Sequence, residues 1–286
     1  SATFSYNYSI VEKLPENEHD KNRVGGNFVW DPETGERVKV GGIAEGERFG
    51  GRWAFNYLGV YQTDAEAAAA PTDRNAGNRI KVAGYSKFED RDGNGLLDFE
   101  DMVFMGYIRP DKMGGIVNTF TYKALTVRFV MDWAAGHVID NAFKANMMGS
   151  VRNNNNGLRE VMWNSWEPGN TGAKYPKYTV QSDIDYNWRN HKRWDNQIGG
   201  TNGASNNSLY YGKGDYLAFR EVSASYTFRG AWLAKVGLSA LEVFGGVYNI
   251  GYITAYDGLT PEIFDGTDYG TYPRPRQYNM GLRLSF

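Results

Sequence analysis

The chain has 286 residues, of which 41% are hydrophobic and 15% aromatic, so it carries enough apolar material to fold and is not a disordered polypeptide. The formal net charge of −2 gives no electrostatic reason to expect a nucleic-acid partner, because such binding requires a concentrated basic face. The absence of cysteine excludes thiolate catalysis, cysteine-based zinc sites and disulfides within the chain, and the three histidines lie far apart in the sequence. The 35 glycines and 20 tyrosines, without long helical stripes, favour a sheet protein.

Alternation of apolar and polar side chains, the period of a β-strand, recurs along the chain. The clearest alternating stretches, in chain order, are 4–10, 116–122, 125–133, 216–228, 236–247 and 278–286. Weaker candidates are the stretches 53–57 and 79–88. We therefore expect about eight strands, many of them near the roughly ten residues that a tilted membrane-spanning strand needs.

The connections between these strands alternate between short and long. A tight turn joins Tyr122 to Leu125, and a short segment covers 229–235, but an insertion occupies 139–213. Outer-membrane barrels have short periplasmic turns and long external loops, so we expect the segments 62–112, 139–213 and 251–275 to be extracellular. Within the insertion, the stretch 158–166 predicts a short helix ended by Pro168, either as a packed surface helix or facing a substrate or lid.

The overall hydropathy is compatible with a membrane barrel. No run of about 18 apolar residues occurs, so no transmembrane helix is expected. A barrel strand exposes only every second side chain to lipid, and a mean hydropathy of −0.56 does not argue against one. The chain shows no signal peptide, and Ser1 leads directly into a strand-like pattern, so we expect a mature fragment of a longer protein.

The final stretch shows the alternation most clearly. Its apolar side chains all fall on one side of an extended strand: Tyr278, Met280, Leu282, Leu284 and Phe286. We expect Met280, Leu282 and Leu284 to face lipid and Asn279, Gly281 and Arg283 to face the lumen, because a slip of one residue would place an arginine in hydrocarbon. The terminal aromatic residue resembles the signal read by the outer-membrane assembly machinery. The alternative is the last strand of a soluble sandwich.

The segment from Asp90 to Asp101 has the spacing of an EF-hand-type calcium loop. Its oxygen-bearing ligand positions are Asp90, Asp92, Asn94, Leu96 through its carbonyl, Asp98 and Asp101. Gly95 supplies the turn, but Asp101 replaces the usual bidentate glutamate and no amphipathic helix flanks the loop. The sequence predicts a structural Ca²⁺ site here, and the alternative is a solvated Asp-Gly turn that binds nothing.

Nothing in the sequence indicates an enzyme. Six oxygen-bearing groups within one short loop resemble a metal cage more than the acid and base of a glycosidase. Gly-x-Ser-x-Gly, Walker and dinucleotide-binding motifs are also absent from the sequence.

Several segments, in the same order, resemble those of one family of membrane proteins, the SusC/RagA family of TonB-dependent outer-membrane transporters. The resembling segments are 57–62, the acidic loop 90–101, 106–115, 166–176, 215–226, 247–250, 257–262, 272–276 and the final strand. The resemblance covers nearly the whole chain. Ala218 and Glu221 depart from the family pattern, as does Leu259-Thr260-Pro261-Glu262, where the family has Asp-Pro-Glu.

The resemblance implies that residues 1–286 form the C-terminal part of a transmembrane antiparallel β-barrel of roughly 22 strands. It places the plug domain and the TonB box outside this chain. It further implies TonB-dependent import of oligosaccharides or oligopeptides across the outer membrane of a Gram-negative, Bacteroidetes-like bacterium. The partners implied are a SusD-like surface lipoprotein, the TonB complex, the remaining barrel and plug segments, outer-membrane lipid and the glycan or peptide substrate.

Two other interpretations remain at the level of sequence. One is a self-contained eight-stranded barrel that serves as an anchor. The other is a soluble or anchored calcium-dependent carbohydrate-binding β-domain, favoured by the acidic loop and the many aromatic residues. The direction of the alternating apolar side chains separates a soluble domain from a membrane barrel, because they face an inner core in the first and lipid in the second.

Overall fold

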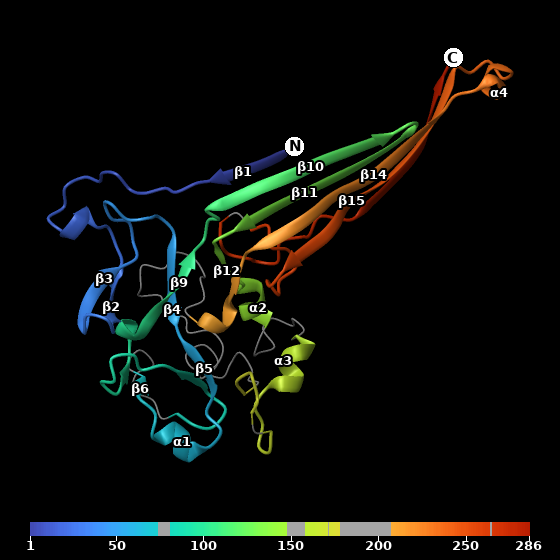
Figure 1. Ribbon diagram of the computed structural model, residues 1–286. Coiled ribbons are helices and arrows are strands. Elements are labelled where there is room, and N and C mark those ends of the chain that lie inside the picture. The colour runs from blue at the N-terminus through green and yellow to red at the C-terminus, as the bar shows by residue number, and fades with distance from the viewer. Residues whose placement is uncertain (74–80, 148–157, 171, 178–206, 264) are drawn as a thin grey trace.

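The computed structural model describes residues 1–73, 81–147, 158–170, 172–177, 207–263 and 265–286. Its main element is an antiparallel six-stranded sheet (Figure 1). In their order across the sheet the strands are β1 (Ala2–Tyr6), β10 (Lys112–Tyr122), β11 (Leu125–Ala135), β14 (Tyr216–Phe228), β15 (Ala240–Thr254) and β16 (Gln277–Ser285). The expected all-β antiparallel class is therefore confirmed.

Short and long connections leave opposite ends of the sheet, as the sequence predicted. At the turn end, Lys123 adopts a positive φ of 54° in the tight turn between β10 and β11. Helix α4 (Ala231–Ala234) lies in the connection between β14 and β15 at the same end. At the loop end, three long segments leave the sheet after β1, β11 and β15 (Figure 1). Because neighbouring strands are antiparallel, successive connections lie at opposite ends of the sheet, with the short ones at one end and the long ones at the other.

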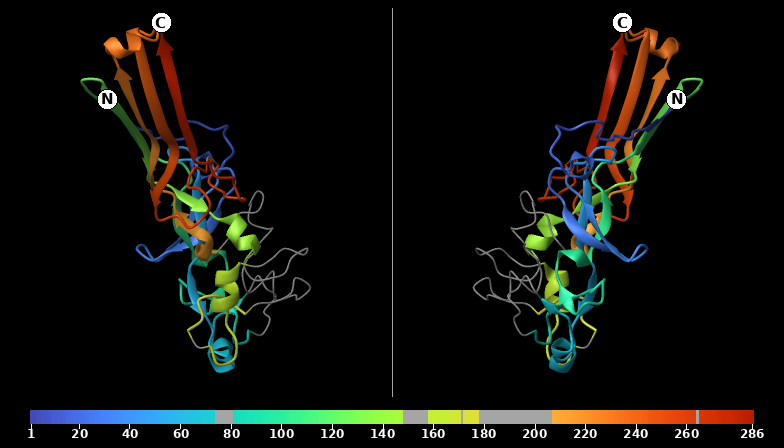
Figure 2. Two further views of the ribbon diagram at one scale, coloured as in Figure 1. Left: turned by 90° about the vertical axis from the view of Figure 1, so that its right-hand side faces the viewer. Right: turned by 90° about the vertical axis from the view of Figure 1, so that its left-hand side faces the viewer.

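The segments at the loop end fold into a separate layer of small elements, which we call the loop part (Figure 2). Its strands are β2 (Asn27–Asp31), β3 (Glu36–Val40), β4 (Gly51–Phe55), β5 (Tyr57–Val60), β6 (Thr72–Asp73), β7 (Ser86–Phe88), β8 (Leu96–Leu97), β9 (Met102–Tyr107), β12 (Val138–Asp140) and β13 (Tyr211–Lys213). Its helices are η1 (Asp20–Asn22), α1 (Asp64–Ala68), η2 (Phe99–Asp101), α2 (Ala142–Met147), α3 (Arg159–Asn164) and η4 (Ser208–Tyr210). The strands pair in twos as β2–β3, β4–β9, β5–β7, β6–β8 and β12–β13.

The two weaker strand candidates do not join the main sheet, which has six strands where about eight were expected. The stretch 53–57 is interrupted at Asn56, whose side chain donates a hydrogen bond to Glu89, and it divides between β4 and β5. The second candidate contributes only β7, and its residues 79–80 lie outside the described residues. Strands of three to five residues are too short to cross a membrane.

Three element boundaries also differ from the sequence prediction. Strand β1 ends at Tyr6, and the next amide, of Asn7, donates to the Asp111 carbonyl where the chain turns into the loop part. Strand β15 begins at Ala240, because Gly237 turns the chain with a φ of 77° after α4. A helix is present where one was expected at 158–166, but α3 covers only Arg159–Asn164, and much of the insertion around it lies outside the described residues.

The buried hydrophobic clusters of the described residues lie in the loop part. The largest of them contains Val29, Phe55, Phe88, Leu97 and Met102. A second cluster joins α2, α3 and η4, with Val161, Tyr175 and Tyr210 in its centre. The main sheet has no such cluster on either face in the described ranges. Its apolar side chains therefore need lipid or other protein segments to cover them. Among the helices described, none is long and apolar enough to cross a membrane.

Candidate functional site

The main sheet has one apolar and one polar face. Residues directly opposite each other in an antiparallel pair point to the same side, so the strand registers assign each side chain to a face. The apolar face includes Phe4, Tyr6, Ile116, Phe120, Tyr122, Leu125, Val127, Phe129, Met131, Trp133, Leu217, Phe219, Val222, Ala224, Tyr226, Phe228, Leu241, Val243, Val247, Ile253, Tyr278, Met280, Leu282 and Leu284, with Lys112 and Asn118 as polar exceptions. Met280 is 91% exposed and Leu282 66% exposed, and the only aromatic ring outside the sheet that contacts this face among the described residues is Trp232 of α4, at Phe228, so most of the face is uncovered.

The opposite face carries mainly hydroxyl, amide and charged side chains. It includes Thr3, Ser5, Thr119, Thr121, Thr126, Arg128, Asp132, Tyr216, Glu221, Ser223, Ser225, Thr227, Glu242, Tyr248, Tyr252, Thr254, Gln277, Asn279 and Arg283, interrupted by Met113, Val117, Val130, Ala134, Ala218 and Phe244. Two cross-strand ion pairs join neighbouring strands: Arg283 Nη1 lies 2.5 Å from Glu242 Oε2, and Arg128 Nε lies 3.2 Å from Glu221 Oε2. The expected separation of Met280, Leu282 and Leu284 from Asn279, Gly281 and Arg283 is thus present in the sheet.

A β-bulge in β14 turns one arginine onto the polar face. Glu221 pairs with Val130 and Phe219 pairs with Met131, which leaves Arg220 as the extra residue between them. A bulge re-aims its side chain, and here both Arg220 and Glu221 are directed to the polar side. The Arg220 guanidinium forms a forked ion pair with Asp132, in which Nη2 lies 2.8 Å from Oδ2.

Arg220 also holds the loop between β15 and β16 through an ion pair with Glu262. The second oxygen of Glu262 accepts a hydrogen bond from the Tyr252 hydroxyl at 2.8 Å and lies 3.2 Å from Arg274 Nε. Burial raises the pKa of Glu262, but the hydrogen bonds from Arg220 and Tyr252 outweigh it, so the pKa lies below its ordinary value. The ionised Glu262 therefore fastens this loop to the sheet.

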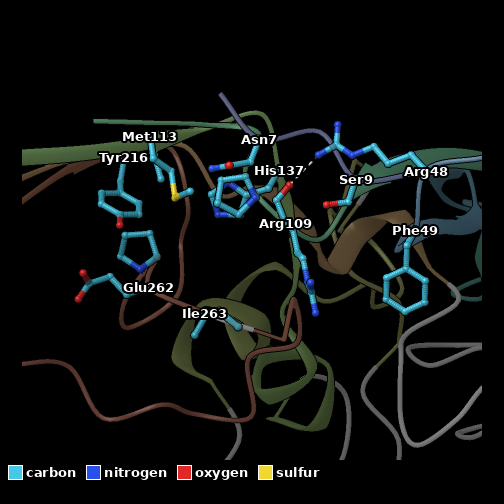
Figure 3. A pocket seen from close by; sticks show the side chains of 13 residues that line it. Asn7, Ser9, Arg48, Phe49, Arg109, Met113, His137, Tyr216, Glu262 and Ile263 are labelled. Atoms are coloured by element: carbon cyan, nitrogen blue, oxygen red, sulfur yellow. Dashed lines mark hydrogen bonds between the residues drawn. The ribbon is translucent and has the colours of Figure 1, made fainter. Parts of the chain in front are cut away.

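A cavity of about 580 Å³ lies where the polar face meets the loop part (Figure 3). Its lining residues come from three places along the segment between β1 and β10, from the loop-end residues of β10, β11 and β14 and the turn after β11, and from the fastened loop: Asn7, Ser9, Arg48, Phe49, Arg109, Pro110, Met113, Ala134, His137, Tyr216, Pro261, Glu262 and Ile263. In Figure 3 the side chains of Tyr216 and Glu262 lie on one side of Arg109, and Phe49 lies on the other. Ligand sites in proteins are commonly concave, mostly apolar and furnished with a few polar groups, as this cavity is.

The histidine in the wall of the cavity is neutral near pH 7. His137 is 5% exposed, and burial lowers its pKa, although the carboxylates of Asp215 and Asp111 oppose this shift. Its ring lies against Gly214, where a Cβ would meet Nε2 at 2.3 Å, so glycine at that position leaves room for the imidazole. His137 is therefore a packed wall residue and adds no charge to the cavity at neutral pH.

The structure brings together three of the residues expected to bind calcium. Single carboxylate oxygens of Asp90, Asp92 and Asp101 lie within 4.8 Å of one another. Burial raises the pKa of Asp101 to about 6; backbone amides of Asp98 and Arg91 oppose the shift, and the charges of Asp92 and Asp90 add to it. Three carboxylates this close to one another are a donor set that fits a hard divalent cation.

The other three expected ligands are engaged locally. Asn94 donates to Asp92 Oδ2 at 2.6 Å and accepts from the Leu96 amide at 2.7 Å. Asp98 caps η2 by accepting from the Glu100 amide at 2.9 Å, while Asp101 accepts from the Asp98 amide at 2.8 Å. Leu96 lies in β8, opposite Thr72. The Asp98 side chain thus has a capping role that the spacing of the motif did not indicate.

The sequence analysis did not identify Arg220, Glu262 or the residues of the cavity as a site. One signal was present: the apolar alternation of β14 is interrupted by two consecutive charged residues, Arg220 and Glu221, and such an interruption is typical of a bulge. The partners Asp132 and Glu262 lie 88 and 42 residues from Arg220, so their contacts depend on tertiary structure.

No family model matches the chain, but its similarity to known proteins extends over nearly all of its residues. TonB-dependent receptor P3 of Formosa agariphila is 26% identical over 300 residues, which cover 99% of this chain and 26% of the relative. TonB-dependent receptor P26 of the same organism is 22% identical over 99% of this chain, and TonB-dependent receptor SusC of Bacteroides thetaiotaomicron is also 22% identical over 99%. The chain spans about a quarter of the length of these curated relatives.

The fold is similar to that of a solved peptide transporter. The structure of the RagAB peptide transporter matches the whole chain with a TM-score of 0.61 and 18% identity, over 27% of that chain. The RagAB peptide importer in the 'open-open' state matches with a TM-score of 0.60 and 16% identity. These relatives are named as receptors and transporters rather than enzymes. In sequence the chain is thus similar to a segment of TonB-dependent receptors that include SusC, and in fold it is similar to a segment of the RagAB peptide transporter.

Proposed function

We propose that the chain forms the C-terminal part of the membrane barrel of a TonB-dependent transporter in the outer membrane of a Gram-negative, Bacteroidetes-like bacterium. One observation carries this proposal: the main sheet presents an apolar face that the described elements leave mostly uncovered and a polar face with ion pairs. In a barrel the first face contacts lipid and the second lines the lumen. The plug and the other strands belong to the rest of the protein.

The transported substrate is an oligosaccharide or oligopeptide that a SusD-like lipoprotein delivers at the loop end. The names of the relatives support this class, because one is SusC and the solved structure is described as a peptide transporter. The TonB complex supplies the energy, and the substrate crosses without breaking a covalent bond. The loop part then shapes the extracellular entrance, and the polar face forms part of the path.

Uptake by cells tests this function directly. A strain deleted for the full-length transporter is complemented with the wild-type gene, and uptake of fluorescent oligosaccharides and oligopeptides is followed with and without a functional TonB complex. We expect uptake of at least one of the two classes that requires both the transporter and TonB. Uptake that is unchanged by deletion of either component contradicts the proposal.

The acidic loop has a structural role in this proposal, as a Ca²⁺ site formed by Asp90, Asp92 and Asp101 with further oxygens from Asn94, Leu96 and Asp98 when the cation binds. The proximity of three carboxylates supports it, because a divalent cation relieves their mutual repulsion. A calcium-dependent carbohydrate-binding domain is the second candidate function. The exposed apolar face argues against a soluble form of that domain, because a soluble sandwich would bury this face.

A further inference from the structure

The charges around the loop cavity do not balance. The cavity is lined by two arginines, Arg48 and Arg109, and one carboxylate, Glu262, while His137 is neutral. Arg48 is already paired, with Nη1 3.5 Å from Asp111 Oδ2 and its guanidinium 4.2 Å from the centre of the Tyr107 ring. The question is therefore whether Glu262 neutralises Arg109.

The contacts of Glu262 show that it does not. Arg220 binds one of its carboxylate oxygens, and Tyr252 and Arg274 bind the other. Arg109 makes no ion pair with any residue in the described ranges. Its guanidinium carbon lies 5.9 Å from the centre of the Phe49 ring, which is a cation–π contact. One positive charge in the cavity is thus left for a ligand.

Arg109 is also held in place for such a role. Its carbonyl accepts a hydrogen bond from Arg48 Nη2 at 3.0 Å, and Pro110 follows it and restricts its backbone. Figure 3 shows the Arg109 side chain extending across the middle of the cavity. The Arg109 side chain is exposed, so a ligand can reach its guanidinium, and Met113, Tyr216 and Ile263 add apolar surface to the wall of the same cavity.

We propose that this cavity binds a carboxylate of the transported oligomer and that Arg109 is the residue that recognises it. A planar carboxylate matches the guanidinium fork in a bidentate geometry, and the apolar wall accommodates the adjoining part of the ligand. Because both Glu262 oxygens are occupied, the cavity offers no anion for a ligand cation. The inference rests on the proposed import function and narrows its substrates to acidic ones: a uronate-containing oligosaccharide or a peptide with a free C-terminal carboxylate.

Binding to the purified full-length transporter in detergent tests this proposal by isothermal titration calorimetry. The probes are two matched pairs: trigalacturonate with its methyl ester, and an N-acetylated tripeptide acid with its C-terminal amide. We expect the acid member of one pair to bind at least about tenfold more tightly than its neutral partner, because a charge-assisted hydrogen bond is lost in the neutral form. The pair that shows this difference identifies the source of the carboxylate.

Variants assign the effect to Arg109. R109Q should remove the preference for the acid, and R109K should restore part of it, since lysine keeps the charge without the fork. R229Q is the matched control, because Arg229 is exposed near the turn end and should leave the preference intact. Equal binding of acid and neutral probes by the wild type, no binding of either pair, or an unchanged preference in R109Q overturns the proposal.

The failure of this inference is distinguishable from failure of the import function. Binding by purified protein does not require the TonB complex, whereas uptake by cells does. TonB-dependent uptake with no carboxylate preference overturns the role of Arg109 and leaves the import function standing. Carboxylate-selective binding without TonB-dependent uptake overturns the import function and leaves the binding site standing.

Discussion

Arg283 and Glu242 lie directly opposite each other on β16 and β15, with 2.5 Å between Nη1 and Oε2, on the polar face of the sheet. The Arg283 side chain is 70% exposed, so the ion pair contributes little to stability. Its value is that it fixes the strand register: a slip of β16 by one residue would place Arg283 beside Leu241 or Val243 of β15, on the other face of the sheet. In the proposed barrel, the face that carries Arg283 is therefore the one that lines the lumen, and the opposite face contacts lipid.

Replacing Leu282 with arginine should prevent correct barrel assembly. A charged side chain on the lipid face costs about 2–4 kcal/mol near the membrane midplane. Loss of the folded, heat-modifiable band on gels of isolated outer membranes measures this effect. N279R on the same strand is the control, and it should assemble normally because Asn279 lies on the polar face. Equal behaviour of the two variants would contradict the assignment of the faces.

Glu262→Gln should loosen the loop between β15 and β16. The side chains of Glu262 and Arg220 are only 11% and 17% exposed, and the amide replaces a charged partner of two arginines. We expect amide hydrogen exchange in residues 255–263 to accelerate by about tenfold, or ~1.4 kcal/mol of local stability. E242Q serves as the control at an exposed pair and should change exchange little. A loop with unchanged protection in E262Q would show that the ion pair does not fasten it.

The same carboxylate predicts a pH dependence of loop docking. The pKa of Glu262 is lowered below its ordinary 4.5, so the docked loop favours the ionised form. The stabilisation is complete above pH 4.5 and is lost as the pH falls through the lowered value. Hydrogen exchange of the loop, corrected for intrinsic rates, should therefore rise only below pH 4.5. The transition should be absent from E262Q, and its persistence there would assign it to another group.

Asp92→Ala should abolish binding of Ca²⁺ to the acidic loop, measured by terbium luminescence and its displacement by Ca²⁺. The reason is that Asp92 is one of the three carboxylates that lie together, so its removal leaves too few charged oxygens. The loop should lose order while the strands of the main sheet remain folded. D98N tests whether Asp98 is also a ligand: asparagine keeps the cap on η2, so a loss of terbium binding in D98N assigns Asp98 as a ligand as well. Unchanged terbium binding in D92A would remove the site.

Strands could be predicted from sequence wherever one face of the sheet is apolar and the other polar. β10, β11, β14 and β16 follow this alternation for most of their length, and the positive φ of Lys123 fits the tight turn between the first two. The strands of the loop part were missed or misplaced because they are short and pack on both sides. Val29, for example, belongs to a local core that no long-range period indicates.

The candidate site could be predicted only in part, for a different physical reason. The acidic loop is local in sequence, so its spacing alone brought Asp90, Asp92 and Asp101 together as candidates. The Arg220 cluster and the cavity join residues from β14, from the loop before β16 and from the segment around Arg109. Contacts over such separations are determined by strand order and register, which the sequence pattern did not give.

The most direct test of the central claim is site-directed spin labelling of β16 in the full-length transporter reconstituted in lipid bilayers. The chain contains no cysteine, so single cysteines can be introduced at positions 279–284 without changing native ones in this segment. We predict that labels at 280, 282 and 284 are accessible to oxygen, which partitions into lipid, and that labels at 279, 281 and 283 are accessible to a water-soluble nickel reagent. Uniform accessibility, or the opposite alternation, would contradict the assignment of this sheet to a membrane barrel.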